Sequence, residues 1–130
     1  MKIFGIGSDI INIKRLERTF KKGGSNFKKR VFSKNEISYC DSKINSYSYY
    51  AKRFAAKEAF SKALGTGLRK GISLKCIEVF NDKKGKPYIK LKGNTHKYLM
   101  KKVRNKKCKI HLTLSDDEPW AQATVIITHS

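Results

Sequence analysis

An alanine-rich segment from about Tyr47 to Leu64 constrains the fold of this chain more than any other feature. Alanine is the strongest helix former, and Gly65 follows the segment directly, in the position where a left-handed glycine closes many helices. We therefore predict a long helix from about Tyr47 to Leu64. The chain has 130 residues, which leaves room for one domain with one modest core for this helix to pack on.

In the rest of the chain, alternating apolar residues predict strands, and apolar residues three and four apart predict helices. The strands are expected at residues 2–11, 73–80, 87–91, 110–114 and 121–127. The further helices are expected at residues 13–23, 33–41 and 94–105. Ser33 and Glu36 form a capping box at the start of the second of these helices. Together the elements predict a single α+β domain over residues 1–130, an antiparallel sheet packed against helices.

The formal net charge of +20 indicates an anionic partner. The lysines are spread along the whole chain, without an arginine-rich arm, a helix-turn-helix, a cold-shock pattern or an RNP-type aromatic motif. A basic RNA-binding or ribosome-associated protein is therefore an alternative function that rests on the charge alone. A lysine-rich compositional bias would explain the same charge without any partner.

The compartment is expected to be the cytoplasm. The apolar runs are only a few residues long, and the N-terminal segment carries one charge, so neither a membrane span nor a signal peptide is expected. Cys40, Cys76 and Cys108 are an odd number of cysteines without metal-ligand spacing, which favours reduced structural thiols.

Glu58 is an unusual residue within the predicted long helix. A projection at about 100° per residue places Glu58 and Lys62 on the apolar stripe, whereas Arg53 and Lys57 fall largely outside it. A carboxylate on a core-facing stripe is costly unless it is paired or coordinates a metal. A Glu58–Lys62 pair at positions i and i+4 is the structural alternative.

Asp9 is the second unusual acid, because it lies in an apolar segment where it gains nothing from packing. Its structural alternative is an N-cap for the helix that begins near Ile13. Gly5 and Gly7 lack the third glycine of a dinucleotide-binding loop. Asp9 and Glu58 together are what Mg²⁺ needs when substrate phosphates and water supply its other ligands. The pattern alone leaves these alternatives open.

The run RFAAKEAFSKALGTG, residues 53–67, closely resembles the signature helix of the holo-[acyl-carrier-protein] synthases. Three further blocks occur in the family's order: GIGSDI at 5–10, the segment 81–87 with its GKP, and HLTLS at 111–115. The resemblance covers essentially the whole chain and implies a 4'-phosphopantetheinyl transferase fold. It implies Mg²⁺-dependent transfer of the phosphopantetheine of coenzyme A to a serine of an acidic acyl carrier protein. Adenosine 3',5'-bisphosphate would be the second product, and the holo carrier would serve fatty acid biosynthesis.

The resemblance also assigns roles to residues. Asp9 and Glu58 would be the catalytic, magnesium-binding pair. Contacts with coenzyme A would come from Ser61, Lys62, Gly65, Pro87 and Ser115, with Pro87 near the adenine. The carrier protein would dock on Lys14, Arg15 and Arg18. A homotrimer with active sites at its subunit interfaces is implied, without a nucleic-acid or membrane partner. The proton acceptor stays open between a metal-bound water, Glu58 and, less favoured because of its capping box, Glu36.

One position departs from the family pattern. Many relatives carry a histidine directly after the serine of the last block, where this chain has Asp116. A role of that histidine in orienting phosphate or moving a proton is therefore not expected here. An extra acid near a diphosphate would need the metal or lysines to offset its charge.

Overall fold

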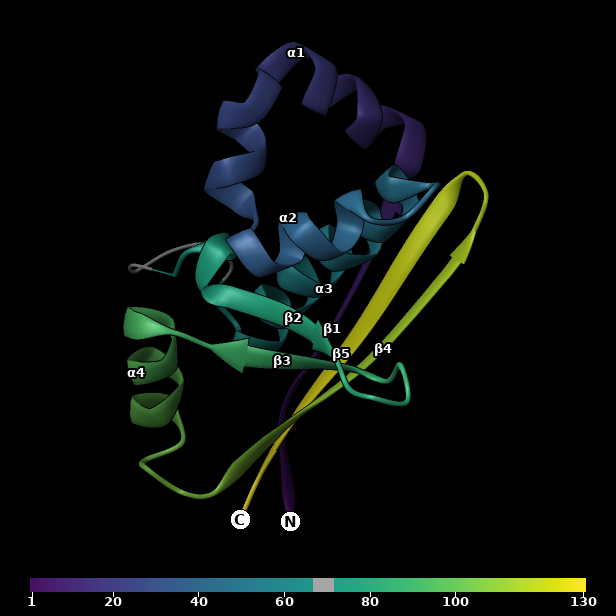
Figure 1. Ribbon diagram of the computed structural model, residues 1–130. Helices are drawn as coiled ribbons and strands as arrows, with labels where there is room; N and C mark the ends of the chain where they lie inside the picture. Colours follow the sequence, from purple (N-terminus) through teal and green to yellow (C-terminus); the bar gives the residue numbers. More distant parts are fainter. Residues whose placement is uncertain (67–71) are drawn as a thin grey trace.

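The computed structural model describes residues 1–66 and 72–130 and confirms an α+β fold with antiparallel sheets packed against helices (Figure 1). The elements are β1 (Lys2–Asn12), α1 (Ile13–Val31), α2 (Lys34–Asp41), α3 (Ser46–Leu64), a 3₁₀ turn η1 (Leu74–Cys76), β2 (Ile77–Asn81), β3 (Pro87–Leu91), α4 (Gly93–Lys102), β4 (Cys108–Asp117) and β5 (Trp120–His129). Gly67, which ends the signature run, lies outside the described residues.

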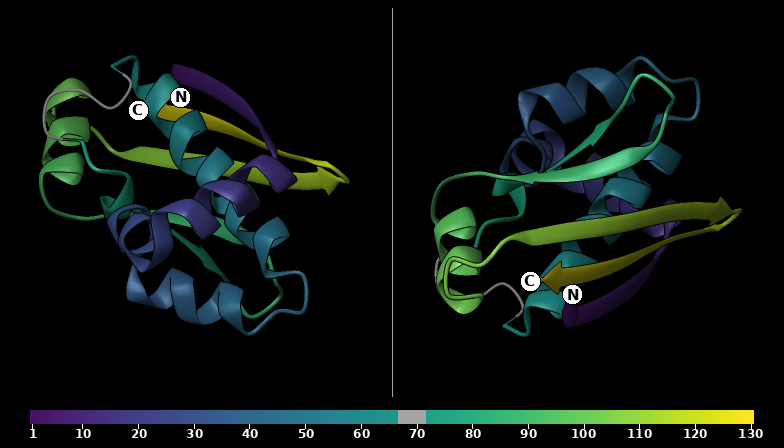
Figure 2. Two further views of the ribbon diagram at one scale, coloured as in Figure 1. Left: turned by 90° about the horizontal axis from the view of Figure 1, so that it is seen from above. Right: turned by 90° about the horizontal axis from the view of Figure 1, so that it is seen from below.

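The strands form a three-stranded sheet of order β1-β5-β4 and a separate β2–β3 hairpin. Helix α3 crosses the molecule between them and contacts β1, β5, β2, α1 and α2. The β4–β5 hairpin is long, and its turn reaches beyond the helices in both views of Figure 2. The two chain ends lie side by side, because Lys2 of β1 pairs with His129 of β5.

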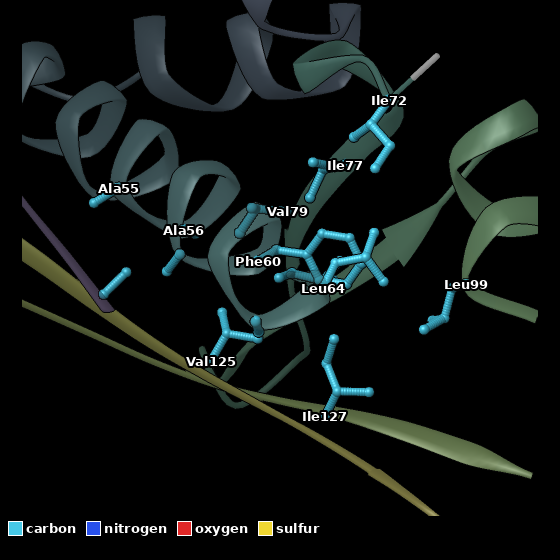
Figure 3. Close-up of a cluster of buried hydrophobic side chains, with 14 of the residues drawn as sticks. Ala55, Ala56, Phe60, Leu64, Ile72, Ile77, Val79, Leu99, Val125 and Ile127 are labelled. Atoms are coloured by element: carbon cyan, nitrogen blue, oxygen red, sulfur yellow. The ribbon is translucent and has the colours of Figure 1, made fainter. Parts of the chain in front are cut away.

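The main core lies where α3 meets the sheet, the β2–β3 hairpin and α4. Figure 3 shows Phe60 and Leu64 of α3 pointing into the same apolar cluster as Val79, Leu99 and Ile127. These side chains are almost wholly buried. A second cluster joins α1, α2 and the N-terminal half of α3. Helix α3 contributes to both clusters and is therefore the centre of the fold.

Strand β1 approaches α3 so closely that two of its positions admit only glycine. A Cβ at Gly5 would lie 1.8 Å from the carbonyl oxygen of Ala63, and one at Gly7 would lie 1.9 Å from that of Ala59. The glycines of β1 and the alanines of α3 thus serve one backbone-to-backbone contact. This contact, and not a nucleotide-binding loop, explains the glycine pair.

The projection of α3 onto a single apolar stripe is wrong for two of its cations. Arg53 and Lys57 are 2% and 0% exposed, although they were expected largely outside the buried face. The Lys57 ammonium donates to Glu36 Oε1 at 2.7 Å and to the Ile77 carbonyl oxygen at 2.6 Å. Glu36 also accepts from the Val79 amide at 2.9 Å. A helix packed on several sides has no exposed face left for these charges, so α2 and β2 supply their partners.

The other differences are local. Helix α1 does not end at the glycine pair but continues to Val31 after a break at Gly24, whose φ is +60°. The expected strand at 73–80 begins only at Ile77, since residues 74–76 form η1. The capping box of Ser33 and Glu36 is confirmed. Among the described helices, none has both the length and the apolar character that crossing a membrane requires.

The contact between β1 and α3 predicts the effect of a single methyl group. Gly7→Ala should lower the free energy of unfolding by about 3–5 kcal/mol, because the new Cβ overlaps the Ala59 carbonyl and the two elements must separate. Urea denaturation would measure this change. Ser8→Ala is the matched control on the exposed side of the strand and should stay within about 0.5 kcal/mol. Equal stabilities of the two variants would contradict the close contact.

Candidate active site

Asp9 lies on the face of β1 that turns toward α3, in the register where Gly7 touches the helix. Its Oδ1 accepts from the Lys62 ammonium at 3.0 Å, and the same ammonium donates to the Ser8 carbonyl oxygen at 3.0 Å. Asp9 does not cap α1, because Asn12 Oδ1 accepts from the Arg15 amide at 3.0 Å and fills that role. Its carboxylate therefore belongs to the junction of β1 and α3.

Glu58 is half-buried one helical turn before Lys62, and its carboxylate is close enough to Asp9 for the two charges to interact. Burial raises the pKa of Glu58 above its ordinary value of 4.5, the negative charge of Asp9 raises it further, and Lys62 lowers it. The ammonium of Lys62 binds Asp9 instead of forming the i,i+4 pair with Glu58 that the sequence allowed. The structure thus brings Asp9, Glu58 and Lys62 together from two elements.

The donor set of this junction suits a hard divalent cation. Two carboxylates lie close enough for one to raise the pKa of the other, with one lysine to offset them. Within residues 1–66 and 72–130, no group of three or more His, Cys, Asp or Glu side chains could hold a metal by itself. A cation at Asp9 and Glu58 would therefore take its remaining ligands from water and substrate phosphates, as Mg²⁺ commonly does.

The other residues expected to contact the coenzyme occupy different environments. Gly65 is exposed and ends α3 with φ +88°, a conformation that favours glycine. Ser61 is 1% exposed, and its hydroxyl donates to the Lys57 carbonyl oxygen at 3.0 Å, so its contact with the coenzyme stays a prediction. Ser115 is exposed on the sheet face opposite α3, where it donates to Gln122 Oε1 at 3.1 Å.

Pro87 lines a separate pocket of about 260 Å³ next to Arg53, which the sequence reasoning missed as a functional residue. The Arg53 guanidinium donates to Asn81 Oδ1 at 2.6 Å and lies over the Tyr39 ring at 4.2 Å. Within the described residues, Arg53 has no carboxylate partner, and its buried Nε has no hydrogen-bond acceptor. A buried, unneutralised guanidinium facing a pocket is an anion-binding group.

A sequence signal for Arg53 was available. No acid occurs three or four residues from it, so an arginine inside this alanine-rich helix has no helical ion pair. Asp116 lies near the same pocket, because Lys52, which lines it, pairs with Asp116 Oδ1 at 3.0 Å. The extra acid is thus offset by a lysine, as expected.

The carboxylate pair with Lys62 forms one group of candidate residues, and Arg53 with the Pro87 pocket forms the other. The two groups lie on different sides of α3. Along a helix of about 100° per residue, Arg53 is about 180° from Lys62 and about 140° from Glu58. Lys62 reaches Asp9 of β1, whereas Arg53 reaches Asn81 at the end of β2. A single chain therefore does not bring the carboxylate pair and the Pro87 pocket to one surface.

The basic residues expected to receive a carrier protein lie directly after β1. Lys14, Arg15 and Arg18 are exposed on the first turns of α1, five to nine residues beyond Asp9 in the sequence. An apolar groove of about 360 Å³, lined by Leu16 and Arg15 among others, runs beside them. The structure therefore places a basic and apolar surface at the end of the strand that carries Asp9.

Residues 5–124 match the family model of the 4'-phosphopantetheinyl transferase superfamily, which defines the class of protein. The chain is 46% identical over 127 residues to the holo-[acyl-carrier-protein] synthase of Dinoroseobacter shibae, a match that covers 97% of this chain and 91% of the relative. The synthase of Neisseria meningitidis has a TM-score of 0.88 at 36% identity, covering 97% of this chain and 98% of that one. The synthase of Helicobacter pylori, solved in complex with coenzyme A, has a TM-score of 0.79 at 32% identity. That match covers 95% of this chain and 99% of the Helicobacter pylori chain.

The chain therefore belongs to the holo-[acyl-carrier-protein] synthases of this superfamily. This membership confirms the resemblance seen in the signature run and replaces the RNA-binding alternative. It also confirms the predicted fold, since the match in three dimensions covers nearly the whole of both chains.

The raised pKa of Glu58 predicts a stability gain when its charge is removed. Because the folded-state pKa lies above the ordinary 4.5, the ionised carboxylate opposes folding once the pH exceeds that value. Glu58→Gln should therefore raise the melting temperature at pH 7 by about 2–4 °C and change it little at pH about 3.5. Glu17→Gln, at a partly exposed acid paired with Lys21, should give no such gain. A loss of stability in Glu58→Gln at pH 7 would contradict the raised pKa that burial and Asp9 give Glu58.

Proposed function

We propose that this chain performs the reaction of its family through a magnesium ion held by Asp9 and Glu58. The reaction transfers the phosphopantetheine of coenzyme A to apo acyl carrier protein, giving the holo carrier that fatty acid biosynthesis uses. The carrier's serine hydroxyl forms a new bond to the β-phosphorus, the pyrophosphate linkage breaks, and adenosine 3',5'-bisphosphate leaves. We expect the reaction in the cytoplasm, in keeping with three free cysteines.

The observation that carries this proposal is the convergence of Asp9, Glu58 and Lys62 at the junction of β1 and α3. When bound there, magnesium would neutralise phosphate charge and favour departure of the leaving group. Lys62 is 54% exposed at its side chain and already lies on Asp9, so its ammonium can reach a phosphate without a change in the fold. Positioning and electrostatics of this kind do most of the work in phosphoryl transfer.

Glu58 is the carboxylate best suited to accept the serine proton. Its carboxylate lies at the junction with Asp9 and Lys62, where the carrier's serine would approach the phosphate. Glu36, the other candidate, is 1% exposed and already accepts from Lys57 and the Val79 amide. We therefore propose that, if a carboxylate takes the proton, it is Glu58 and not Glu36.

The pocket beside Pro87 supports a place for the adenosine end of coenzyme A. Arg53 and Lys52 provide positive charge for a phosphate, and the Tyr39 and Tyr49 rings line the same pocket. Arg53 is held by Asn81 and lacks a carboxylate partner within the described chain, so it is ready to bind an anion. Pro87 would then lie next to the adenine, as the family resemblance implies.

A homotrimer with shared active sites would bring the two groups together. Asp9 and Lys62 on one side of α3, and Arg53 on the other, cannot contact one small ligand within a single chain without bridging the helix. The sheet face opposite α3 also remains uncovered, with Ile6 and Ile10 each 60% exposed. Exposed isoleucines on a strand face are typical of a subunit contact. We propose that this face joins the subunits and that each site takes its two halves from neighbouring chains.

Lys14, Arg15 and Arg18 would receive the acidic surface of the carrier protein. Their position at the start of α1 lies just beyond β1, so a docked carrier could extend its serine toward Asp9. Complementary charge would mainly raise the rate of encounter and fix the orientation of the carrier.

The metal assignment is tested by incubating the protein with coenzyme A, Mg²⁺ and apo carrier protein and weighing the carrier by mass spectrometry. We expect a mass gain of one phosphopantetheine that a chelator abolishes and added Mg²⁺ restores. Asp9→Ala and Glu58→Ala should each lower the rate by about a hundredfold or more. Mg²⁺ with coenzyme A should raise the melting temperature of the wild-type protein but not of either variant.

Asp117→Ala is the control for this experiment, because it removes one exposed acid outside the site and should leave the rate within about twofold. Full activity in Asp9→Ala or Glu58→Ala would rule out the magnesium assignment. The absence of any mass gain with the wild-type protein and several carriers would rule out the reaction itself.

Shared sites are tested by complementation between two variants. Asp9→Ala and Arg53→Gln should each lose most activity alone. If a site takes Asp9 from one chain and Arg53 from its neighbour, refolding the two variants together should restore about a quarter of the wild-type rate, because random mixing forms that share of intact sites. Mixing the folded variants without subunit exchange is the control. The lack of any recovery after co-refolding would show that each chain carries its own complete site.

A further inference from the structure

A pocket of about 410 Å³ lies between β3, α4 and β4 and shares no residue with the sites described above. Its floor is aliphatic and consists of Ile89, Leu91, Leu99, Met100 and Ile110. Ile89 and Leu99 belong to the main core, and Figure 3 shows Leu99 at the margin of that cluster. No Phe, Tyr or Trp occurs among the described residues of its lining. The pocket is thus an aliphatic depression that opens from the core to the surface.

The rim of this pocket is basic. His96, Lys106 and Lys107 line it, and both lysines are exposed. The sequence contains no Asp or Glu between Asp82 and Asp116, although lysines recur throughout that stretch. The rim lysines therefore have no acid close to them in the sequence. A positive field over an aliphatic pocket favours a ligand that is both anionic and apolar.

The turn after α4 forms one wall of this pocket, and backbone hydrogen bonds fix its conformation. The Asn105 amide donates to the Met100 carbonyl oxygen at 2.8 Å, and the Lys106 amide donates to the Val103 carbonyl oxygen at 3.1 Å. Arg104 and Asn105 have φ values of +54° and +57°, which non-glycine residues adopt at a cost. These hydrogen bonds hold the turn against that cost. A ligand would therefore meet a wall that needs no ordering on binding.

We propose that this pocket binds a single-chain anionic amphiphile, of which a free fatty acid is the simplest example. Its volume falls within the range of small-molecule sites, and an alkyl chain matches the aliphatic floor. The carboxylate would lie between Lys106 and Lys107. RNA is less favoured because single-stranded bases need aromatic side chains to stack on. A membrane surface is less favoured because insertion requires protruding apolar side chains, whereas these line a depression.

Calorimetric titration with octanoate, decanoate and dodecanoate below their micelle concentrations tests the aliphatic floor. Each added methylene should tighten binding by about three- to fourfold until the pocket is full. Dodecyltrimethylammonium has the same chain with a cationic head and should bind about tenfold more weakly or less. An affinity independent of chain length, or equal for the two heads, would overturn the proposal.

The basic rim is tested with two matched charge reversals. Lys106→Glu with Lys107→Glu should weaken dodecanoate binding by about tenfold or more. Lys83→Glu with Lys84→Glu changes the net charge equally, at exposed lysines in the β2–β3 turn that do not line the pocket, and should change the affinity by less than about twofold. Equal losses in both variants would show that only the overall charge attracts the ligand, which would overturn the site.

Cysteine alkylation locates the ligand without reference to activity. Cys108 lines the pocket, whereas Cys76 is half-buried outside its lining. Dodecanoate at ten times its dissociation constant should slow alkylation of Cys108 by N-ethylmaleimide by about tenfold and leave Cys76 unchanged. Peptide mass spectrometry measures both rates. Unchanged Cys108 reactivity would overturn the proposal, as would binding of anionic phospholipid vesicles or an RNA oligonucleotide in place of the monomeric amphiphile.

Discussion

The backbone of β1 lies directly against the backbone of α3, and the position of Asp9 beside the helix depends on this contact. Gly5 and Gly7 leave room for the carbonyl groups of Ala63 and Ala59, so strand and helix meet without intervening side chains. A larger residue at either glycine would move the strand away from the helix. The same register turns Asp9 toward α3, where Lys62 binds it. The packing of the core and the geometry of the candidate site therefore have one cause.

The charged residues of α3 fall into two kinds: those that are fully paired within the core and those that lack a compensating partner. Lys57 and Glu36 are fully buried but satisfy each other and nearby backbone groups, so removing one partner would leave an uncompensated charge in the core. Arg53 is equally buried but has no carboxylate partner among the described residues. Glu58 is held at a raised pKa beside a like charge. Unbalanced charges of this kind are typical of a site that a substrate or metal completes.

Local signals predicted the elements well, because they act within a few residues: the capping box of Ser33 and Glu36 and the closing Gly65 both stand as expected. The pairing of Asp9 with Glu58 needed the family resemblance, since the sequence alone left the cap and ion-pair alternatives open. The burial of Arg53 and Lys57 was not predictable from a helix projection, which assumes one buried face. The aliphatic pocket behind α4 also depends on elements that only the fold brings together.

The central claim is that Asp9 and Glu58 together form the metal site, and its most direct test is to locate the metal. Crystals grown with coenzyme A and Mn²⁺ in place of Mg²⁺ would show the ion by its anomalous scattering. We expect one strong peak within bonding distance of the Asp9 and Glu58 carboxylates, with the remaining ligands from phosphate and water. A Mn²⁺ peak bound elsewhere, in a protein that remains active with Mn²⁺, would contradict the claim.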